Sequence, residues 1–161
     1  MNDERFLSRP DGNGVVHCPL FIVHMHSKLT TYTDGGARGN PGPAGIGVVI
    51  MEGERVVDSF GRYIGETTNN QAEYRALIAA LQRAFELGAK EVECKLDSEL
   101  VVKQMLREYK VRDKDLQTLF LAAYNLSVGF KKITFQHVRR ELNAAADAEV
   151  NAAIDRHLSN K

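Results

Sequence analysis

The sequence has few cysteines, no net charge and no long apolar run. Its two cysteines, Cys18 and Cys94, lie far apart without a CxxC spacing, which argues against a disulfide framework and a zinc knuckle. Lys and Arg number 21, as do Asp and Glu, so overall charge does not indicate a nucleic-acid partner. Residues 99–141 alone hold nine Lys or Arg and five Asp or Glu. This local excess fits either a basic patch or an ordinary solvated helical face.

The absence of a long apolar run bears on whether the protein is secreted or inserted in a membrane. Residues 15–25 are apolar but are interrupted by a proline and two histidines, and no basic segment precedes them. We therefore expect neither a signal peptide nor a membrane span, and predict a monomeric cytoplasmic protein. Residues 1–27 are expected to form a loosely ordered N-terminal extension, with Met25 as an alternative natural start. The remaining residues 28–158 suit one domain.

Hydrophobic periodicity predicts an α/β fold. The expected order is three strands, a helix, a strand, two helices, a strand and a helix. This order implies a mixed five-stranded sheet flanked by helices, in which three antiparallel strands are extended by two parallel ones. Strands are expected at 29–33, 46–51, 55–64, 92–97 and 133–135, and helices at 70–87, 98–106, 113–127 and 143–158.

Four carboxylates are awkward for a purely structural interpretation. Asp34 and Asp97 end predicted strands, where ligand sites of α/β sheets collect. Glu73 and Asp147 each begin an apolar helical stripe that should face the sheet. A lone acid at a strand end is usually a cap or turn residue, but four that converge would repel one another without a cation. Such a site suits Mg²⁺ or Mn²⁺, and two ions would suit phosphodiester hydrolysis.

The glycine-dense stretch at residues 35–45 is predicted to be a loop. A glycine-rich loop alone is weak evidence, and this one precedes an apolar strand, not a helix. No Gly-Lys-Ser/Thr occurs either, so a P-loop or dinucleotide site is disfavoured. Two interpretations remain open: a simple hairpin turn, or a loop whose backbone approaches phosphates or sugars closely.

Four motifs occur in order, and as a set they resemble type 1 ribonuclease H over about residues 28–158. They are Tyr32-Thr-Asp34-Gly-Gly with Gly39-Asn-Pro-Gly42, Thr67-Thr-Asn-Asn-Gln-Ala-Glu73-Tyr, Asp97-Ser-Glu-Leu-Val and Asn143-Ala-Ala-Ala-Asp147.

The resemblance implies hydrolysis of the RNA strand of RNA/DNA hybrids by two metal ions, which leaves 5′-phosphate and 3′-hydroxyl ends. It makes Asp34, Glu73, Asp97 and Asp147 the metal-binding catalytic carboxylates. Substrate contacts are expected at Gly35, Gly36, Asn40, Thr68, Asn69, Asn70 and Ser98. Taken alone, Asn69 and Asn70 would also fit a plain helix cap.

Two departures from the family pattern point to a compact subgroup. The loop before the last helix lacks the usual histidine, and Arg139 resembles the arginine that the subgroup uses instead. His137 is expected to have a packing role. The long basic handle is absent, so hybrid affinity should depend on salt-sensitive phosphate contacts. The cations expected to make them are Lys103, Arg107, Lys110, Arg112 and Lys114.

Two other functions compete with cleavage of hybrids. A non-cleaving nucleic-acid-binding domain could use the same fold, and loss of one acid would favour it, but all four are present. A small phosphatase or another metal-dependent hydrolase could reuse the carboxylates. The asparagine and glycine motifs, which suit a duplex, argue against this second rival.

Overall fold

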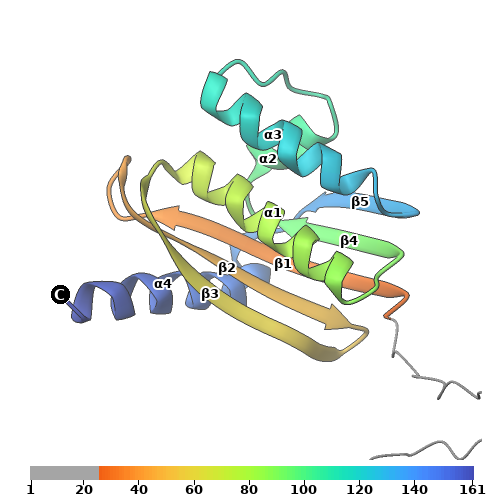
Figure 1. The fold of residues 1–161 in the computed structure, drawn as a ribbon, viewed down its shortest axis with the longest axis horizontal. Helices are drawn as coiled ribbons and strands as arrows, with labels where there is room; N and C mark the ends of the chain where they lie inside the picture. The colour runs from red at the N-terminus through yellow and green to blue at the C-terminus, as the bar shows by residue number, and fades with distance from the viewer. Residues whose placement is uncertain (1–25) are drawn as a thin grey trace, which may run out of the picture.

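The structure is a computed structural model that describes residues 26–161 (Figure 1). The extension expected at residues 1–27 and the alternative start at Met25 lie outside the described residues, apart from positions 26 and 27. The elements are β1 (Lys28–Ala37), β2 (Gly42–Glu52), β3 (Arg55–Thr67), α1 (Asn69–Glu86), β4 (Glu91–Leu96), α2 (Glu99–Met105), α3 (Lys114–Ser127), β5 (Lys132–His137), the 3₁₀ turn η1 (Arg140–Asn143) and α4 (Ala144–Ser159). None of the helices described is long and apolar enough to cross a membrane.

The strands form one mixed sheet in the order β3-β2-β1-β4-β5. β1 pairs with β2, and β2 with β3, in antiparallel fashion. β1 with β4, and β4 with β5, are parallel. The predicted element order and mixed sheet are therefore confirmed. α1 packs on one face of the sheet and carries α3, whereas α4 covers β2 and β3 on the other face (Figure 1).

The main core lies between the sheet, α1 and α3. The predicted apolar stripe of α1 is confirmed, since Leu77, Leu81 and Ala84 have no exposed surface. Gly88 follows the helix with a φ of 81°, a left-handed conformation that glycine adopts readily at helix ends. This packing fixes α1 against the sheet and thereby fixes the position of Glu73, one turn before Leu77.

The glycine-dense stretch at residues 35–45 is not a loop, so that prediction is wrong. β1 and β2 extend into it and leave only a turn at residues 38–41. A Cβ on Gly35 would lie 2.2 Å from the backbone carbon of Ala72 in α1, and one on Gly47 would lie 2.0 Å from a backbone oxygen of α4. The glycines thus let both helices approach the strands closely.

Polar residues precede three of the helices, and two of them cap the helix with a side chain. The Ser98 hydroxyl accepts a hydrogen bond from the Val101 amide, and Asp113 accepts two at the start of α3. Asn143 precedes α4, but its side chain makes no capping bond. Its amide instead donates to the Thr33 carbonyl at 2.8 Å. This buried bond ties the start of α4 to β1 beside Asp34.

Candidate active site

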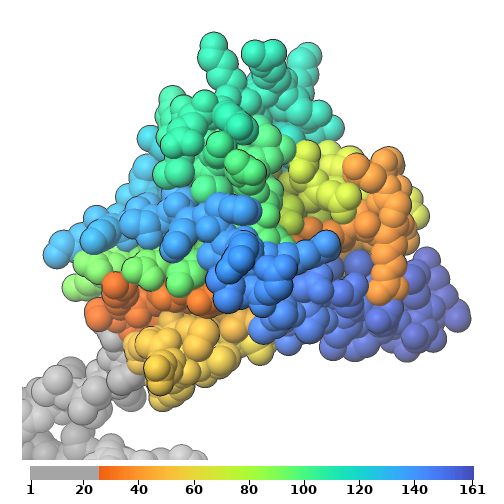
Figure 2. Space-filling model, turned by 180° about the vertical axis from the view of Figure 1, so that it is seen from behind, coloured from red at the N-terminus to blue at the C-terminus, as the bar shows by residue number. Residues whose placement is uncertain are grey.

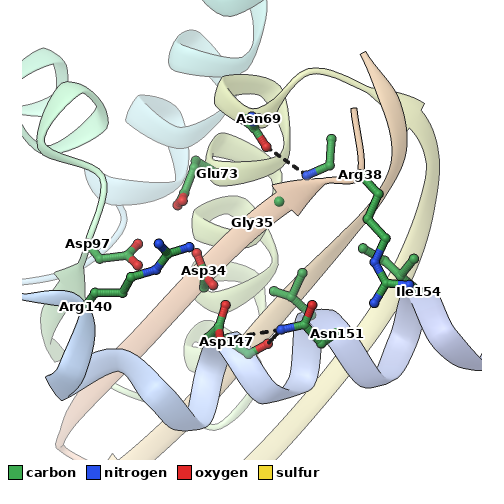
Figure 3. Close-up of a pocket in the computed structure, with 13 residues that line it drawn as sticks. Asp34, Gly35, Arg38, Asn69, Glu73, Asp97, Arg140, Asp147, Asn151 and Ile154 are labelled. Atoms are coloured by element: carbon green, nitrogen blue, oxygen red, sulfur yellow. Dashed lines mark hydrogen bonds between the residues drawn. The ribbon is translucent and has the colours of Figure 1, made fainter. Parts of the chain in front are cut away.

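The four predicted carboxylates reach one region from four different elements. Asp34 lies in β1 opposite Gly47 of β2, and Asp97 directly follows β4. Glu73 lies in the second turn of α1, and Asp147 in the first turn of α4. Because β1 and β4 are parallel neighbours, their carboxyl ends bring Asp34 and Asp97 to the same edge. All four line one open pocket of about 450 Å³ (Figure 3).

Three of the four carboxylates converge tightly. One oxygen from each of Asp34, Glu73 and Asp97 lies within 4.8 Å of the other two. Asp147 is outside this acidic triad but faces the same pocket from α4 (Figure 3). Asn151, one turn further along α4, donates to the Asp147 carboxylate at 3.4 Å. The site is therefore a triad with a fourth carboxylate beside it.

Two members of the triad, Asp34 and Glu73, hold their protons more strongly than free carboxyl groups do, because their pKa values are raised. Burial, followed by the negative charge of Asp97, raises the pKa of Asp34 from its usual 3.8 to about 7. The pKa of Glu73 is raised well above its usual 4.5, first by burial and then by the charges of Asp34 and Asp97. Each added charge disfavours ionisation of its neighbours. A cation in the pocket would remove this penalty.

The oxygen atoms of the triad suit a hard divalent cation. Among the described residues, Glu73 Oε2 and Asp97 Oδ1 are buried without a hydrogen-bond partner. Buried polar atoms normally have a hydrogen-bond partner, so these two oxygens are suited to be the ligands of a cation. Carboxylate oxygens are preferred by Mg²⁺ and Mn²⁺, and no histidine or cysteine belongs to the group. The residues present thus fit the metal that the sequence suggested.

A basic side chain also enters the pocket, one position away from the one expected. Arg140 lines the pocket and extends into it from η1 (Figure 3). Arg139 is exposed, precedes η1 and is not among the lining residues. The structure therefore places Arg140, and not Arg139, in the acidic pocket.

His137 lies at the end of β5, beside the site. Its Nε2 atom donates to the backbone carbonyl of Asp97 at 3.2 Å. The ring is largely exposed, so it links the ends of β4 and β5 more than it fills a core. This contact is a more specific role than the general packing role expected from the sequence.

Asn40 and Asn69, two of the expected substrate contacts, link the 38–41 turn to the start of α1. Asn69 Oδ1 accepts a hydrogen bond from the Ala37 amide at 2.8 Å, and Asn40 Oδ1 accepts one from the Asn69 amide at 3.1 Å. Both side chains are exposed. Their oxygens thus join the 38–41 turn to the start of α1, while neither side-chain NH₂ group has a hydrogen-bond partner among residues 26–161.

The other expected substrate contacts differ in whether they line the pocket. Gly35, Gly36 and Asn69 line the pocket. Asn70 is exposed in the first turn of α1. Thr68 and Ser98 are occupied as the N-caps of α1 and α2, which supports a helix-starting role for both. Asn40, Thr68, Asn70 and Ser98 are not among the lining residues of the pocket.

Three polar or charged residues that line the pocket were not identified from the sequence: Arg38, Arg140 and Asn151. Arg38 pairs with Asp155 of α4 at 2.6 Å, so the 38–41 turn is attached to α4 as well as to α1. Asn151 lies four residues after Asp147, a helical spacing that would have placed it on the same face. No local signal separates Arg140 from Arg139.

Comparison with known proteins identifies several relatives. The family model described as "Reverse transcriptase-like" matches residues 32–153. A ribonuclease HI of Halobacterium salinarum is 41% identical over 148 residues, which is 91% of this chain and 68% of that protein. A bifunctional protein of Mycobacterium tuberculosis is 44% identical over 130 residues. That match covers 80% of this chain and 36% of the mycobacterial protein.

Solved structures agree with these matches. The crystal structure of ribonuclease H1 from Halobacterium salinarum superposes with a TM-score of 0.79 at 43% identity, covering 81% of this chain and 99% of that one. A ribonuclease H1 named LC11, isolated from compost and solved in complex with an RNA/DNA hybrid, gives a TM-score of 0.77 at 48% identity. It covers 81% of this chain and 99% of its own.

Proposed function

Because this chain belongs to the ribonuclease H family, we propose that it is an endonuclease that hydrolyses the RNA strand of RNA/DNA hybrids. The products would carry 5′-phosphate and 3′-hydroxyl ends. The observation that carries the proposal is the acidic triad of Asp34, Glu73 and Asp97, which bring one oxygen each to within 4.8 Å of one another and line an open pocket. The hybrid-bound LC11 relative supports the choice of substrate.

The triad would hold the metal on which the family depends, and Asp147 would help to hold a second ion once substrate is bound. We propose Mg²⁺, with Mn²⁺ as an alternative, because the ligands are carboxylate oxygens alone. When bound, such ions supply an activated water and stabilise the oxygen that leaves the phosphate. Asn151 would keep the Asp147 carboxylate oriented through its 3.4 Å hydrogen bond.

Arg140 is proposed to act on the phosphate itself. Its planar guanidinium offers several N–H donors to phosphate oxygens and keeps its charge at any working pH. From η1 it enters the pocket that the triad lines. We assign it the role that the sequence suggested for Arg139: to hold the scissile phosphate or the product phosphate without holding metal.

The choice between the RNA and the DNA strand would depend on Asn40, Asn69 and the backbone of β1 at Gly36. The 2′-hydroxyl is present on every RNA nucleotide, and it can donate and accept hydrogen bonds. The free amide of Asn69 and the backbone at Gly36 are suitable partners on the RNA side of the pocket. Asn40 and Thr68, next to them, would follow the phosphates of the DNA strand, and Asn70 would contact bases and sugars.

A cleavage assay tests the proposal. Labelled RNA/DNA, RNA/RNA and DNA/DNA duplexes are incubated with the protein in Mg²⁺ or Mn²⁺, and we expect the RNA of the hybrid to be cut. Asp34→Asn should remove cleavage while circular dichroism shows an intact fold, because an amide cannot replace a shared carboxylate ligand. Glu108→Gln, which changes an exposed acid outside the pocket, is the matched control.

Two results would contradict the proposal. Near wild-type cleavage by Asp34→Asn would contradict the carboxylate mechanism. Hybrid binding without any cleavage by the wild-type protein would support the non-cleaving alternative. Substrate length gives a further check. Since contacts from several loops span more than one sugar, a DNA duplex with a run of about four ribonucleotides should be cut, and one with a single ribonucleotide poorly.

A cytoplasmic location and a monomeric state are proposed as well. Cys94 is a free, buried thiol, and burial raises its pKa to about 12. This suits a structural residue in a reducing compartment. Light scattering of the purified chain would test the monomer, since a dimer would double the measured mass.

A further inference from the structure

A second hollow is lined by residues from the end of α2, the connection that follows it and the middle of α3. We call it the α2–α3 groove. Its volume of about 620 Å³ falls within the range of small-ligand sites. Arg107 and Lys110 contribute two cations to its wall, and Tyr109, Phe120 and Tyr124 contribute three rings. Among residues 26–161, no carboxylate lines it. The groove thus suits an anionic ligand with flat apolar parts.

The rings and cations of the groove are interleaved. The Arg107 guanidinium lies 5.9 Å from the centre of the Tyr124 ring, which also stacks on Phe120 at 6.0 Å. The Lys103 amine lies 4.9 Å from the centre of the Tyr109 ring. As whole residues Tyr109 is 47% exposed and Tyr124 is 38% exposed, so neither is buried. Exposed rings beside cations are what proteins use to bind unpaired nucleic acid, because bases stack on the rings and phosphates meet the cations. Bases inside a duplex are already stacked and cannot offer their faces.

The backbone at Arg107 gives an independent reason to assign it a ligand. The amides of Arg107 and Glu108 donate to the carbonyls of Gln104 and Lys103 at 3.0 and 2.9 Å, which closes α2 in the way that usually requires glycine. Arg107 has a φ of 66°, and no other non-glycine residue among those described has a positive φ. This conformation is unfavourable for a residue with a Cβ. Stability alone would favour glycine here, and arginine adds a cation to the groove.

The groove is also close enough to the acidic pocket to serve the same ligand. α2 begins two residues after Asp97 and is seven residues long, so it spans about 10 Å. The connection at residues 106–113 and the start of α3 project from the molecule at the top of Figure 2. A strand that leaves a bound hybrid near Asp97 would reach the groove within a few nucleotides.

We propose that the α2–α3 groove binds unpaired nucleotides of a single-stranded DNA tail that continues from the hybrid. Bases would stack on Tyr109 and Tyr124, and phosphates would meet Arg107 and Lys110. The inference rests on the proposed cleavage of hybrids and adds a substrate preference to it. Hybrids that end in a single-stranded DNA tail should be better substrates than blunt hybrids of the same duplex.

The test compares three hybrids with the same duplex. One is blunt, one carries a DNA tail of roughly ten thymidines, and one carries an equally long tail without bases, with the tails placed at each DNA end in turn. Steady-state cleavage in Mg²⁺ should give a KM about fivefold or more lower for the thymidine tail, with kcat unchanged. The tail without bases should behave nearly as the blunt hybrid does. Equal KM values for all three hybrids, or equal gains for both tails, would overturn the proposal.

Two variants distinguish loss of tail binding in the groove from loss of the fold. Tyr124→Leu keeps an apolar side chain but removes the ring, and it should lose the tail advantage while cutting the blunt hybrid normally. Arg107→Gly should lose the advantage too, although its unfolding midpoint should rise as the backbone strain is relieved. Lys131→Ala removes an exposed cation outside the groove and should keep the tail advantage. A full tail advantage in both Tyr124→Leu and Arg107→Gly would refute the assignment.

A binding measurement distinguishes failure of this inference from failure of the proposed function. Fluorescence anisotropy with the labelled thymidine tail alone reports on the groove without any cleavage. If the protein binds the tail but cuts no hybrid, and Tyr124→Leu weakens tail binding, the result supports the groove as a binding site and contradicts the proposed nuclease activity. Hybrid cleavage with no effect of a tail on KM would reject the groove alone.

Discussion

The raised pKa of Asp34 makes the stability of the metal-free protein depend on pH. Because the folded state holds the proton of Asp34 up to about pH 7, whereas an unfolded chain releases it near pH 4, folding binds a proton between these values. The contribution of this group to stability is therefore fully present at low pH and is lost as pH rises through about 7. Asp34→Asn is neutral at every pH and should escape this loss.

The size of the effect follows from the shift. A pKa moved from 3.8 to about 7 corresponds to about 4 kcal/mol, since each pKa unit is worth 1.36 kcal/mol. Asp34 is only 7% exposed, so solvent screens little of it. In chelator, Asp34→Asn should unfold with a free energy up to about 4 kcal/mol higher than wild type at pH 8, and about 1 kcal/mol higher at pH 4.5.

Urea unfolding followed by circular dichroism measures both proteins in chelator at pH 4.5, 6 and 8. Glu108→Gln, an exposed acid, serves as control and should follow wild type at each pH. Mg²⁺ should then stabilise wild type more than Asp34→Asn, because the variant lacks a ligand. The reasoning fails if Asp34→Asn is less stable than wild type at pH 8 in chelator, or if its gain does not change with pH.

Five other substitutions, two of which are matched controls, test the site and the contacts that hold it in place. Arg140→Ala should lower kcat roughly 10-fold or more with unchanged metal dependence, whereas Arg139→Ala should leave turnover near wild type; the reverse pattern in steady-state kinetics would return the role to Arg139. Gly35→Ala places a Cβ 2.2 Å from the α1 backbone and should lower the unfolding free energy by roughly 3 kcal/mol. Gly36→Ala, with its nearest atom at 3.7 Å, should change it by less than about 0.5 kcal/mol in the same urea titration. Asn143→Ala removes the buried hydrogen bond to the Thr33 carbonyl and should cost about 1 to 3 kcal/mol, and an unchanged urea midpoint would contradict that buried bond.

Most of the fold was predictable because its elements are strongly periodic. α1 carries its apolar residues at helical spacing, and the strands that follow alternate as a half-buried sheet should. The glycines at residues 35–45 were misinterpreted for a physical reason. Glycine marks a turn when the backbone must bend and a close contact when another element must approach, and the local sequence does not distinguish the two.

The site was predictable as a set of residues and less so in its detail. Helical spacing and strand ends point Asp34, Glu73 and Asp97 toward one another, and the structure brings these three together. The arginine differs by one position because η1 adds a tight turn before α4. Asn143 looks like a cap in sequence, yet its partner lies 110 residues away. Contacts of that range depend on tertiary packing, which no local pattern reports.

The pocket draws its carboxylates from positions 34 to 147, on β1, α1, the end of β4 and α4. No fragment much shorter than the domain can contain them all, and β1 meets β4 only after the intervening chain has folded. Activity should therefore return late and all at once during refolding, not in stages. Because the site residues are distributed along the chain in this way, the protein could be divided into two inactive fragments that form the site only together. A break at residues 109–113 separates the triad from Asp147 and Arg140, so each half should be silent and their reassociation should switch cleavage on.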